Sequence, residues 1–594
     1  MVIDTKWSLN ELYSSCNSKE FEDDLELCDK QINSIKEWVN DKLNVESNIT
    51  SNIEAYINLI RNFTSTYAKL MAYTHLSLSV DTTNEEISKA LELLQKKRTE
   101  LTEPMVIFQK WLGNIDELET IILQSELLKE HRFYLLELAS KNKYLLSDRE
   151  EILLSKMSNT GSKAWEKLRG TLSSTQIVDI EIDGEVKQLP LSFVRNMALD
   201  KDPRIRKNAF EAEIKSYEKT EVALAACLNG IKGEVITISK MRGFKSPLEE
   251  TLINSRMDKE TLDNMIDAIK ESLLAFRRYL KKKSEILGHK DGLPFYDVFA
   301  PIGKSGKSFT YEEARDYIVK NFRSFSDNLA DYADNAIKKR WIDVEPKNGK
   351  RGGAFCYNIH PIKESRILTN FTGGFKNVIT LAHELGHGYH GKCLREESIL
   401  NTGYPMPLAE TASIFCETIV MNSALKDADN EEAFNILEGV LQNATQVIVD
   451  IYSRFIFESR LFEHRKEYSL SSKELNKLMI EAQKEAYGDG LDHNILHPYM
   501  WANKTHYYYA NRNFYNFPYA FGLLFAKGLY SRYLEVGESF IADYDKLLAA
   551  TGKKTITKVA KMMDIDVHSI DFWRSSLKLV EKDIERFIEL SPSI

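Results

Sequence analysis

Glycine and proline are scarce in this chain of 594 residues, which has 27 glycines and 13 prolines. Because both residue types mark turns, their scarcity favours long helices over a sheet protein with many turns. The chain is also longer than one hydrophobic core usually serves. We therefore expect a mainly α protein built from two or more lobes.

Cysteine pairs and a basic excess are missing as well. The six cysteines are dispersed without a C-x-x-C pair, so a cysteine zinc site or a redox pair is not expected. A net charge of −9 and a pI of about 5.9 disfavour a nucleic-acid partner, which needs a basic surface. The basic run Lys281–Lys283 is interpreted as a solvated helix face.

Long apolar runs are absent from the sequence. No stretch of about 18 apolar residues occurs, which predicts no membrane span and no membrane partner. The first ten residues have no charged segment followed by an apolar one, so we expect no signal peptide. Together with free thiols, these features predict a cytoplasmic location and leave the oligomeric state open.

The N-terminal part of the chain has the apolar spacing of amphipathic helices. Residues 8 to about 170 are predicted to form consecutive helices, with Ser8 and Glu11 as a capping box at the start. The alternating stretch from Ile177 to Leu189 predicts a hairpin with a two-residue turn, after which helices return. We place a domain boundary there, giving domains 1–190 and 191–594.

A second irregular stretch follows near Pro346. A glycine-rich turn precedes a candidate strand from Ala354 to Ile359, and Arg366 to Phe371 form another. Thr372-Gly373-Gly374 end this stretch, and a helical pattern comes next. The sequence therefore predicts a small β-sheet just before that helix.

The helix after this sheet contains T-L-A-H-E-L-G-H-G-Y-H, residues 380–390. His383 and His387 are four residues apart and share a helix face, so both imidazoles can hold one metal ion. Glu384 lies beside that ion, where it can contact a water. Two imidazoles and one carboxylate suit zinc. The alternative is a core helix whose histidines bond to neighbours, and His390 is interpreted as a helix-end histidine or a supporting residue.

The third ligand decides between these interpretations. His390 and Cys393 occupy positions where H-E-x-x-H-x-x-G-x-x-H requires Gly and His, which excludes that class. Glu410, in the helical pattern P-M-P-L-A-E-T-A-S-I-F-C-E-T (405–418), is the predicted third ligand. Glu417 is predicted to accept a hydrogen bond from a ligand imidazole, with a solvent-facing position as the alternative.

A second histidine pair needs to be weighed. His493 and His497 are also four residues apart, in D-H-N-I-L-H-P. No Glu follows His493, and Pro498 ends any helix at once. We expect no second metal site there.

Several motifs together resemble the oligoendopeptidase F group within the thimet-oligopeptidase-like family of zinc peptidases. They are the two motifs above, G-A-F-C (353–356) and F-Y-N-F-P-Y-A-F-G (514–522), and the likeness starts at Trp7 and spans nearly the whole chain. The resemblance implies a mainly helical enzyme of two lobes around a deep substrate channel, with a small β-sheet next to the zinc-binding helix.

The resemblance also implies the roles of individual residues. One zinc ion per chain falls on His383, His387 and Glu410, and the general base falls on Glu384. A downstream histidine and tyrosines act as hydrogen-bond donors in this family. The matching positions are His506, Tyr519 as the main tyrosine and Tyr515 as a second candidate, although Phe517 stands where some relatives have Tyr. On the residues alone, core packing is the alternative for each tyrosine.

The resulting prediction is a zinc-dependent endopeptidase that hydrolyses internal peptide bonds of short unstructured oligopeptides. A metal-activated water would attack the carbonyl, with Glu384 as base. The strand at 354–359 is expected to pair with the peptide backbone. The alternatives are a dipeptide- or carboxypeptidase-type enzyme, and a peptide-binding helical scaffold whose metal is structural. Glu384 argues against the scaffold, because a structural site gains little from a free carboxylate.

Overall fold

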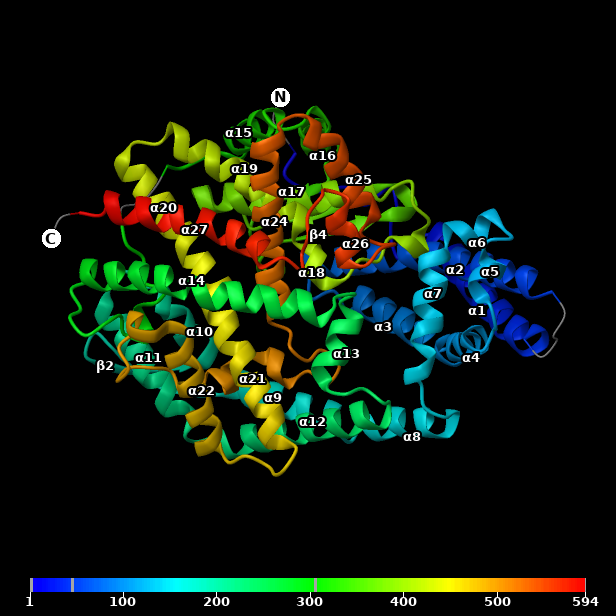
Figure 1. Cartoon of the computed structure of the whole chain (residues 1–594), viewed down its shortest axis with the longest axis horizontal. Coiled ribbons are helices and arrows are strands. Elements are labelled where there is room, and N and C mark those ends of the chain that lie inside the picture. The colour runs from blue at the N-terminus through cyan, green and yellow to red at the C-terminus, as the bar shows by residue number, and fades with distance from the viewer. Residues whose placement is uncertain (1–3, 44–47, 304–306, 593–594) are drawn as a thin grey trace. The chain divides into compact units, whose positions relative to one another are not determined.

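The computed structural model describes residues 4–43, 48–303 and 307–592. Helices dominate, as the composition predicted (Figure 1). The chain forms two compact units: unit 1 is Met1–Leu145, Gly306–Ser423 and Arg532–Asp564, and unit 2 is Leu146–Ser305, Ala424–Ser531 and Ile565–Ile594. The predicted domains 1–190 and 191–594 are continuous stretches, and they stay a prediction.

Unit 1 combines N-terminal helices with the small sheet and the motif helix. Its elements are α1 (Lys19–Lys42), α2 (Ile49–Val80), α3 (Glu85–Thr99), α4 (Thr102–Gly113), α5 (Leu118–Ile122), α6 (Glu126–Glu130), α7 (Arg132–Ser140), η1 (Asn142–Tyr144), α15 (Tyr311–Arg323), α16 (Asp327–Lys338), β3 (Ile342–Asp343), β4 (Phe355–Ile359), η4 (His360–Ile362), β5 (Glu364–Leu368), α17 (Phe375–Cys393), η5 (Ile399–Asn401), α18 (Met406–Ala409), α25 (Ser539–Ala550) and α26 (Ile556–Lys561). One apolar cluster runs from the N-terminal helices to Ile359 and Leu368 of the sheet.

The side chains of Ser8 and Glu11 are in contact, but the helix that the predicted capping box should start is absent. The Ser8 hydroxyl donates to the Glu11 carboxylate at 3.0 Å, yet residues 8–18 form turns and α1 begins at Lys19. The reason is a tertiary contact, since Arg366 donates to the Ser8 carbonyl at 2.6 Å and to Glu11 at 2.9 Å. This buried arginine fixes the segment in a non-helical path.

The predicted small sheet lies just before the motif helix, with strand order β3-β5-β4. The strand expected at Arg366 to Phe371 starts two residues earlier and ends at Leu368. Beyond it, the chain continues alongside β3, because Thr369 N donates to Asp343 O and Phe371 N to Val344 O. Among the described strands, β4 is therefore an edge strand, paired only with β5.

The free edge of β4 follows from the hydrogen-bond directions. The N–H groups of Ile367 and Thr369 point to β3. Because direction alternates along a strand, the residues between them face β4. On β4, the backbone groups of Cys356 and Asn358 therefore face away from β5.

Unit 2 is almost wholly helical. Its elements are α8 (Asp148–Ser158), α9 (Ser162–Thr175), β1 (Ile177–Ile182), β2 (Glu185–Pro190), α10 (Leu191–Asn196), η2 (Met197–Leu199), α11 (Pro203–Tyr217), α12 (Glu221–Met241), α13 (Pro247–Asn254), α14 (Lys259–Ile286), η3 (Phe295–Asp297), α20 (Asn430–Thr445), η6 (Gln446–Asp450), α21 (Ile451–Arg465), α22 (Ser472–Tyr487), η7 (Gly488–Gly490), α23 (Met500–Asn503), η8 (Thr505–Tyr508) and α27 (Ile570–Leu590). Two helices have residues in both units, α19 (Thr411–Asp427) and α24 (Phe517–Val536).

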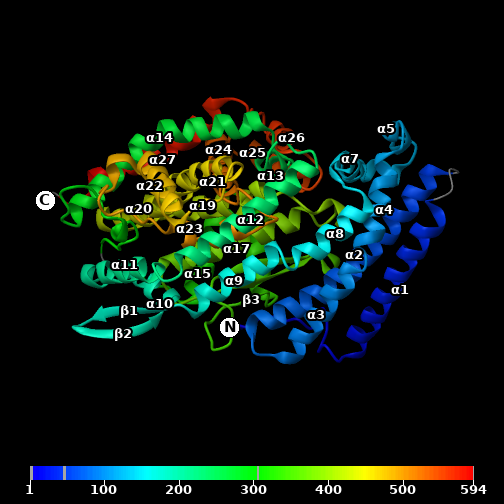
Figure 2. The same cartoon turned by 90° about the horizontal axis from the view of Figure 1, so that it is seen from below.

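The predicted hairpin is confirmed as β1 and β2, which lie beside α10 and α11 (Figure 2). Asp183 and Gly184 form its turn with φ of 55° and 81°. Two positive φ values are those of a type I′ turn, which matches the twist of paired strands.

One helix of unit 2 has the length and composition of a membrane span. In α12, the most apolar stretch of 18 residues is 50% buried inside the protein. Leu224, Leu228 and Ile231 of this helix are buried in the core. Core helices of water-soluble proteins share these properties, so the expected absence of a membrane partner stays a prediction.

Candidate active site

The three predicted metal ligands lie together in unit 1. The Nε2 atoms of His383 and His387 are 3.1 Å apart, one turn from each other on α17. A carboxylate oxygen of Glu410 lies 3.3 Å from His383 Nε2 and 3.6 Å from His387 Nε2. The three ligand atoms all lie within 4.8 Å of one another, a spacing that one cation can bridge.

Glycine at position 386 allows this approach. A Cβ added at Gly386 would lie 2.6 Å from Ala412 O and 2.7 Å from Ser413 Cα. Any larger residue would push α17 away from the segment that carries Glu410. The sequence predicted one helix over 405–418, but the structure breaks it at Glu410, which ends α18 with φ −88° and ψ 2°. The break lies just before the close contact at Ala412 and Ser413, and the Glu410 carboxylate lies beside both histidines.

Two further side chains contact the predicted ligands. Glu417 lies 2.5 Å from His383 Nδ1, the contact expected for an acceptor of its ring N–H. Ser413 donates to Glu410 Oε2 at 2.8 Å. The side chain of Glu417 is 23% exposed, so the solvent-facing alternative is not what the structure shows.

The residues present fit a divalent cation. Three carboxylates, from Glu384, Glu410 and Glu417, surround two imidazoles in a largely buried region. Burial lowers the pKa of His383, but the hydrogen bond and charge of Glu417 outweigh it and raise this pKa to about 9. Burial lowers the pKa of His387 to about 4. A zinc ion would balance this concentration of negative charge and satisfy both ring nitrogens.

Glu384 has the environment of a proton-transfer group. It is 5% exposed, and its Oε2 has no hydrogen-bond partner within the described part of the chain. Burial raises the pKa of Glu384 to about 7, with Glu410 and Glu417 adding to the rise and His383 and a backbone hydrogen bond from Cys356 opposing it. A carboxyl group with a pKa near neutrality can both take up and release a proton.

The edge strand β4 lies against the motif helix. Asn358 Nδ2 donates to the backbone oxygen of His387 at 3.0 Å, and Asn358 Oδ1 accepts from Ser365 at 2.8 Å. Sequence reasoning missed Asn358, because its partner is 29 residues away and no local pattern marks it. A cavity of about 420 Å³ opens beside β4, lined by Tyr357 and Asn358 and by residues of α2, including Ala68.

The predicted hydrogen-bond donors lie together in unit 2. The ring of His506, on η8, is 4.9 Å from that of Tyr515 and 6.3 Å from that of Tyr519, and the two tyrosine rings are 5.5 Å apart. Burial and, to a lesser degree, the charges of Arg454 and Lys504 lower the pKa of His506 to about 4. His506 is therefore a neutral ring near pH 7, with one N–H to donate.

The other histidines have structural surroundings. His390 is fully buried, its Nε2 is 2.7 Å from the Thr551 hydroxyl and its ring stacks on Tyr404 at 4.2 Å. His493 Nε2 is 2.9 Å from the Gly488 carbonyl, and His497 is buried 3.5 Å from Glu213. Within the described residues, neither His493 nor His497 belongs to a group of side chains that could hold a metal ion.

Comparison with known proteins identifies relatives over most of the chain. The sequence model of peptidase family M3 matches residues 196–579, and a model described as oligopeptidase F matches residues 114–175. Oligopeptidase PepF of Bacillus subtilis is 26% identical over 538 residues, 88% of this chain and 78% of the relative. An oligoendopeptidase F homolog of Borreliella burgdorferi is 25% identical over 569 residues, 92% of each chain.

Two solved structures share the fold. The oligoendopeptidase-F of Enterococcus faecium superimposes with a TM-score of 0.72 at 18% identity, covering 96% of this chain and 99% of that chain. A crystal structure from Chlamydophila abortus gives a TM-score of 0.84 at 23% identity, covering 99% and 98%. The mainly helical architecture is thus shared over nearly the full length.

Proposed function

Because the chain belongs to peptidase family M3, we propose that it is a zinc-dependent endopeptidase that hydrolyses internal peptide bonds of short unstructured oligopeptides in the cytoplasm. Relatives named oligopeptidase and oligoendopeptidase F support the substrate class. The single observation that carries the proposal is the group His383, His387 and Glu410 with Glu384 beside it.

Each residue of the group has a separate role in the proposed hydrolysis. His383, His387 and Glu410 would hold zinc, which supplies Lewis acidity for a water and for the scissile carbonyl. Glu384 takes a proton from the water as its oxygen attacks the carbonyl carbon. As the C–N bond breaks, Glu384 passes this proton to the leaving amine. By accepting from Nδ1, Glu417 would keep the His383 ring in the tautomer whose Nε2 is free to hold zinc.

The free edge of β4 is the proposed binding site for the peptide backbone. Cys356 and Asn358 face away from β5, and the Cys356 N–H contacts Glu384, so an extended peptide could add to the sheet through the remaining backbone groups there. A substrate side chain on the face of Tyr357 would meet the cavity beside β4. A narrow channel, implied by the family resemblance, would admit unstructured peptides and exclude folded proteins. Cleavage unaffected by substitutions throughout 352–357 would count against this binding mode.

The donor cluster is proposed to stabilise the oxyanion. His506 and Tyr519 would donate hydrogen bonds to the carbonyl oxygen as it gains charge, with Tyr515 as the second candidate. This role rests on the family resemblance and on the gathering of the three rings.

The test compares wild type with Glu384→Gln on a quenched fluorescent peptide of about ten residues, at equal zinc content. We expect the variant to keep zinc and to lose on the order of 10³-fold in kcat, because the amide cannot accept the proton. Loss of zinc in the variant would show that the roles are assigned wrongly. Equal, negligible rates would favour the peptide-binding scaffold, and product masses separate an endopeptidase from a dipeptide- or carboxypeptidase-type enzyme.

A further inference from the structure

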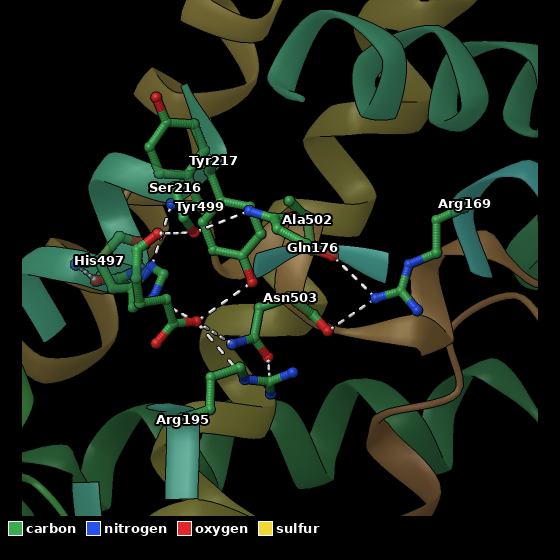
Figure 3. Close-up of polar contacts among 11 residues, drawn as sticks. Arg169, Gln176, Arg195, Ser216, Tyr217, His497, Tyr499, Ala502 and Asn503 are labelled. Atoms are coloured by element: carbon green, nitrogen blue, oxygen red, sulfur yellow. Dashed lines mark hydrogen bonds and ion pairs between the residues drawn. The ribbon is translucent and has the colours of Figure 1, made fainter. Parts of the chain in front are cut away.

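The segment that carries His506 is held by a buried arginine from a distant helix. Arg169, on α9, donates from Nη2 to the backbone oxygens of Ala502 at 2.9 Å and Asn503 at 3.0 Å (Figure 3). Its Nη1 donates to the Thr505 hydroxyl at 2.9 Å. These acceptors lie one to four residues before His506, and they are more than 330 residues from Arg169 in the sequence.

The surroundings of Arg169 are unusual for a buried charge. It is 7% exposed, and within the described residues it forms no ion pair with a carboxylate. Its guanidinium lies 5.1 Å from the centre of the Tyr508 ring. Burying a cation among neutral acceptors is costly, so the arrangement needs a compensating gain. Here the guanidinium satisfies carbonyls at the C-terminal end of α23, which have no partner inside that short helix.

A second set of contacts fixes the same segment through a side chain. Asn503 donates from Nδ2 to Glu213 Oε1 at 2.9 Å and accepts at Oδ1 from Arg195 (Figure 3). Tyr217 donates to the same oxygen of Glu213 at 3.2 Å. The residue three positions before His506 is therefore held at its backbone by Arg169 and at its side chain by the Arg195–Glu213 pair.

His506 itself takes part in none of these contacts. Its ring lies against tyrosine rings, and its Nδ1 is buried without a partner in the described part of the chain. The backbone of residues 502–505, which leads directly to His506, is held by Arg169 and, at Asn503, by the Arg195–Glu213 pair. We infer that Arg169 is a positioning residue for His506, an inference that rests on the proposed role of His506 as a hydrogen-bond donor.

A merely structural role predicts a different result from this positioning role. If Arg169 only joined α9 to the interior, its removal would lower stability. Any loss in kcat would then be the same in wild type and in the His506→Ala background. If Arg169 acts through His506, its removal lowers kcat and leaves KM nearly unchanged, and the loss vanishes once His506 is gone.

The experiment is a double-mutant cycle on the zinc-loaded enzyme with Arg169→Met, His506→Ala and the double variant. We expect Arg169→Met to lower kcat about tenfold with KM within about twofold. In the His506→Ala background, the same change should lower kcat by less than about twofold. Lys167→Met, at an exposed lysine of the same helix, is the matched control and should leave kcat unchanged.

Thr505→Val provides a second variant should Arg169→Met fold poorly. It is nearly isosteric, lies at an exposed position and removes one acceptor of the guanidinium. We expect a loss of a few fold in kcat that again disappears with His506→Ala. If His506→Ala lowers kcat and the Arg169→Met loss is just as large in that background, the positioning role of Arg169 is overturned, whereas the donor role of His506 is not. An undamaged His506→Ala enzyme would overturn both this inference and the donor role, while Glu384→Gln would still report on the peptidase proposal.

Discussion

The predicted metal group of unit 1 and the predicted donor cluster of unit 2 are built in opposite ways. His383, Glu384 and His387 belong to one helix, where four-residue spacing alone brings the imidazoles to one face. His506 and Tyr515 lie outside long helices, on η8 and in the segment before α24. Local periodicity places His383, Glu384 and His387, whereas the second group depends on buried polar side chains from far along the chain.

The segment with Tyr515 shows this dependence a second time. Lys232, fully buried on α12, donates to Glu458 Oε1 at 2.8 Å and to Asn513 Oδ1 at 2.9 Å. Glu458 accepts from Asn516 Nδ2 at 3.0 Å through its other oxygen. A buried ion pair thus holds both ends of the turn around Tyr515, in which Phe514 has a left-handed φ of 52°. Substitutions in the predicted metal group should therefore lower zinc binding, whereas substitutions behind the donor cluster should lower stability or kcat and leave zinc bound.

The largest effect is expected at the metal group. Glu410→Gln replaces a charged ligand with a neutral amide, so zinc binding should be lost and activity should fall at least about 10³-fold. Zinc per chain, measured after gel filtration, and kcat/KM check this. Glu396→Gln, at an exposed glutamate with an 83% exposed side chain, is the control and should keep both. A Glu410→Gln enzyme with full zinc and a normal rate would contradict the assignment of the third ligand.

The next effect is expected at the ion pair behind Tyr515. Lys232→Met leaves the Glu458 carboxylate buried without its cation, which costs about 3–5 kcal/mol of unfolding free energy. Denaturant unfolding measures this loss, and zinc content should stay at the wild-type level. Lys240→Met, at an exposed lysine of the same helix, should change stability by less than about 0.5 kcal/mol. Loss of zinc in Lys232→Met would contradict the independence of the two regions.

A moderate effect is expected at Glu417, beside the predicted ligand His383. Glu417→Gln keeps the shape at His383 Nδ1 but removes the charge, so zinc affinity should fall about 10- to 100-fold. Competition with a chelator measures the affinity. Unchanged affinity would show that Glu417 only packs against His383. The zinc site would then depend on His383, His387 and Glu410 alone.

These regions also explain what the sequence could predict. The helical composition, the hairpin around Asp183 and the sheet before α17 follow from local patterns, and the structure confirms them. The turn at Ser8 does not follow, because a contact with the distant Arg366 overrides the helix signal there, and no local signal marks the break at Glu410. No pattern in the sequence announces that Arg169 reaches Asn503, because that contact joins segments 334 residues apart.

The smallest effect is expected among the donors, where the sequence left two tyrosines open. Tyr519 lies in the first turn of α24, and its N–H donates to the Asn516 carbonyl at 3.1 Å, so its position is coupled to the turn that Lys232 holds. Tyr519→Phe should lower kcat on the order of tenfold with unchanged zinc, because His506 still donates to the oxyanion. Tyr515→Phe, half-buried in the same cluster, is the matched comparison and should lower kcat less.

The pattern of these two losses decides which group donates. A larger loss in Tyr515→Phe would transfer the main donor role to Tyr515, and unchanged rates in both would leave His506 alone. If both rates are unchanged, the position of His506 would matter more for catalysis, because it would be the single donor and it follows the backbone that Arg169 holds. In that case Arg169→Met should still lower kcat although neither tyrosine variant does, and the same peptide assay measures all three rates.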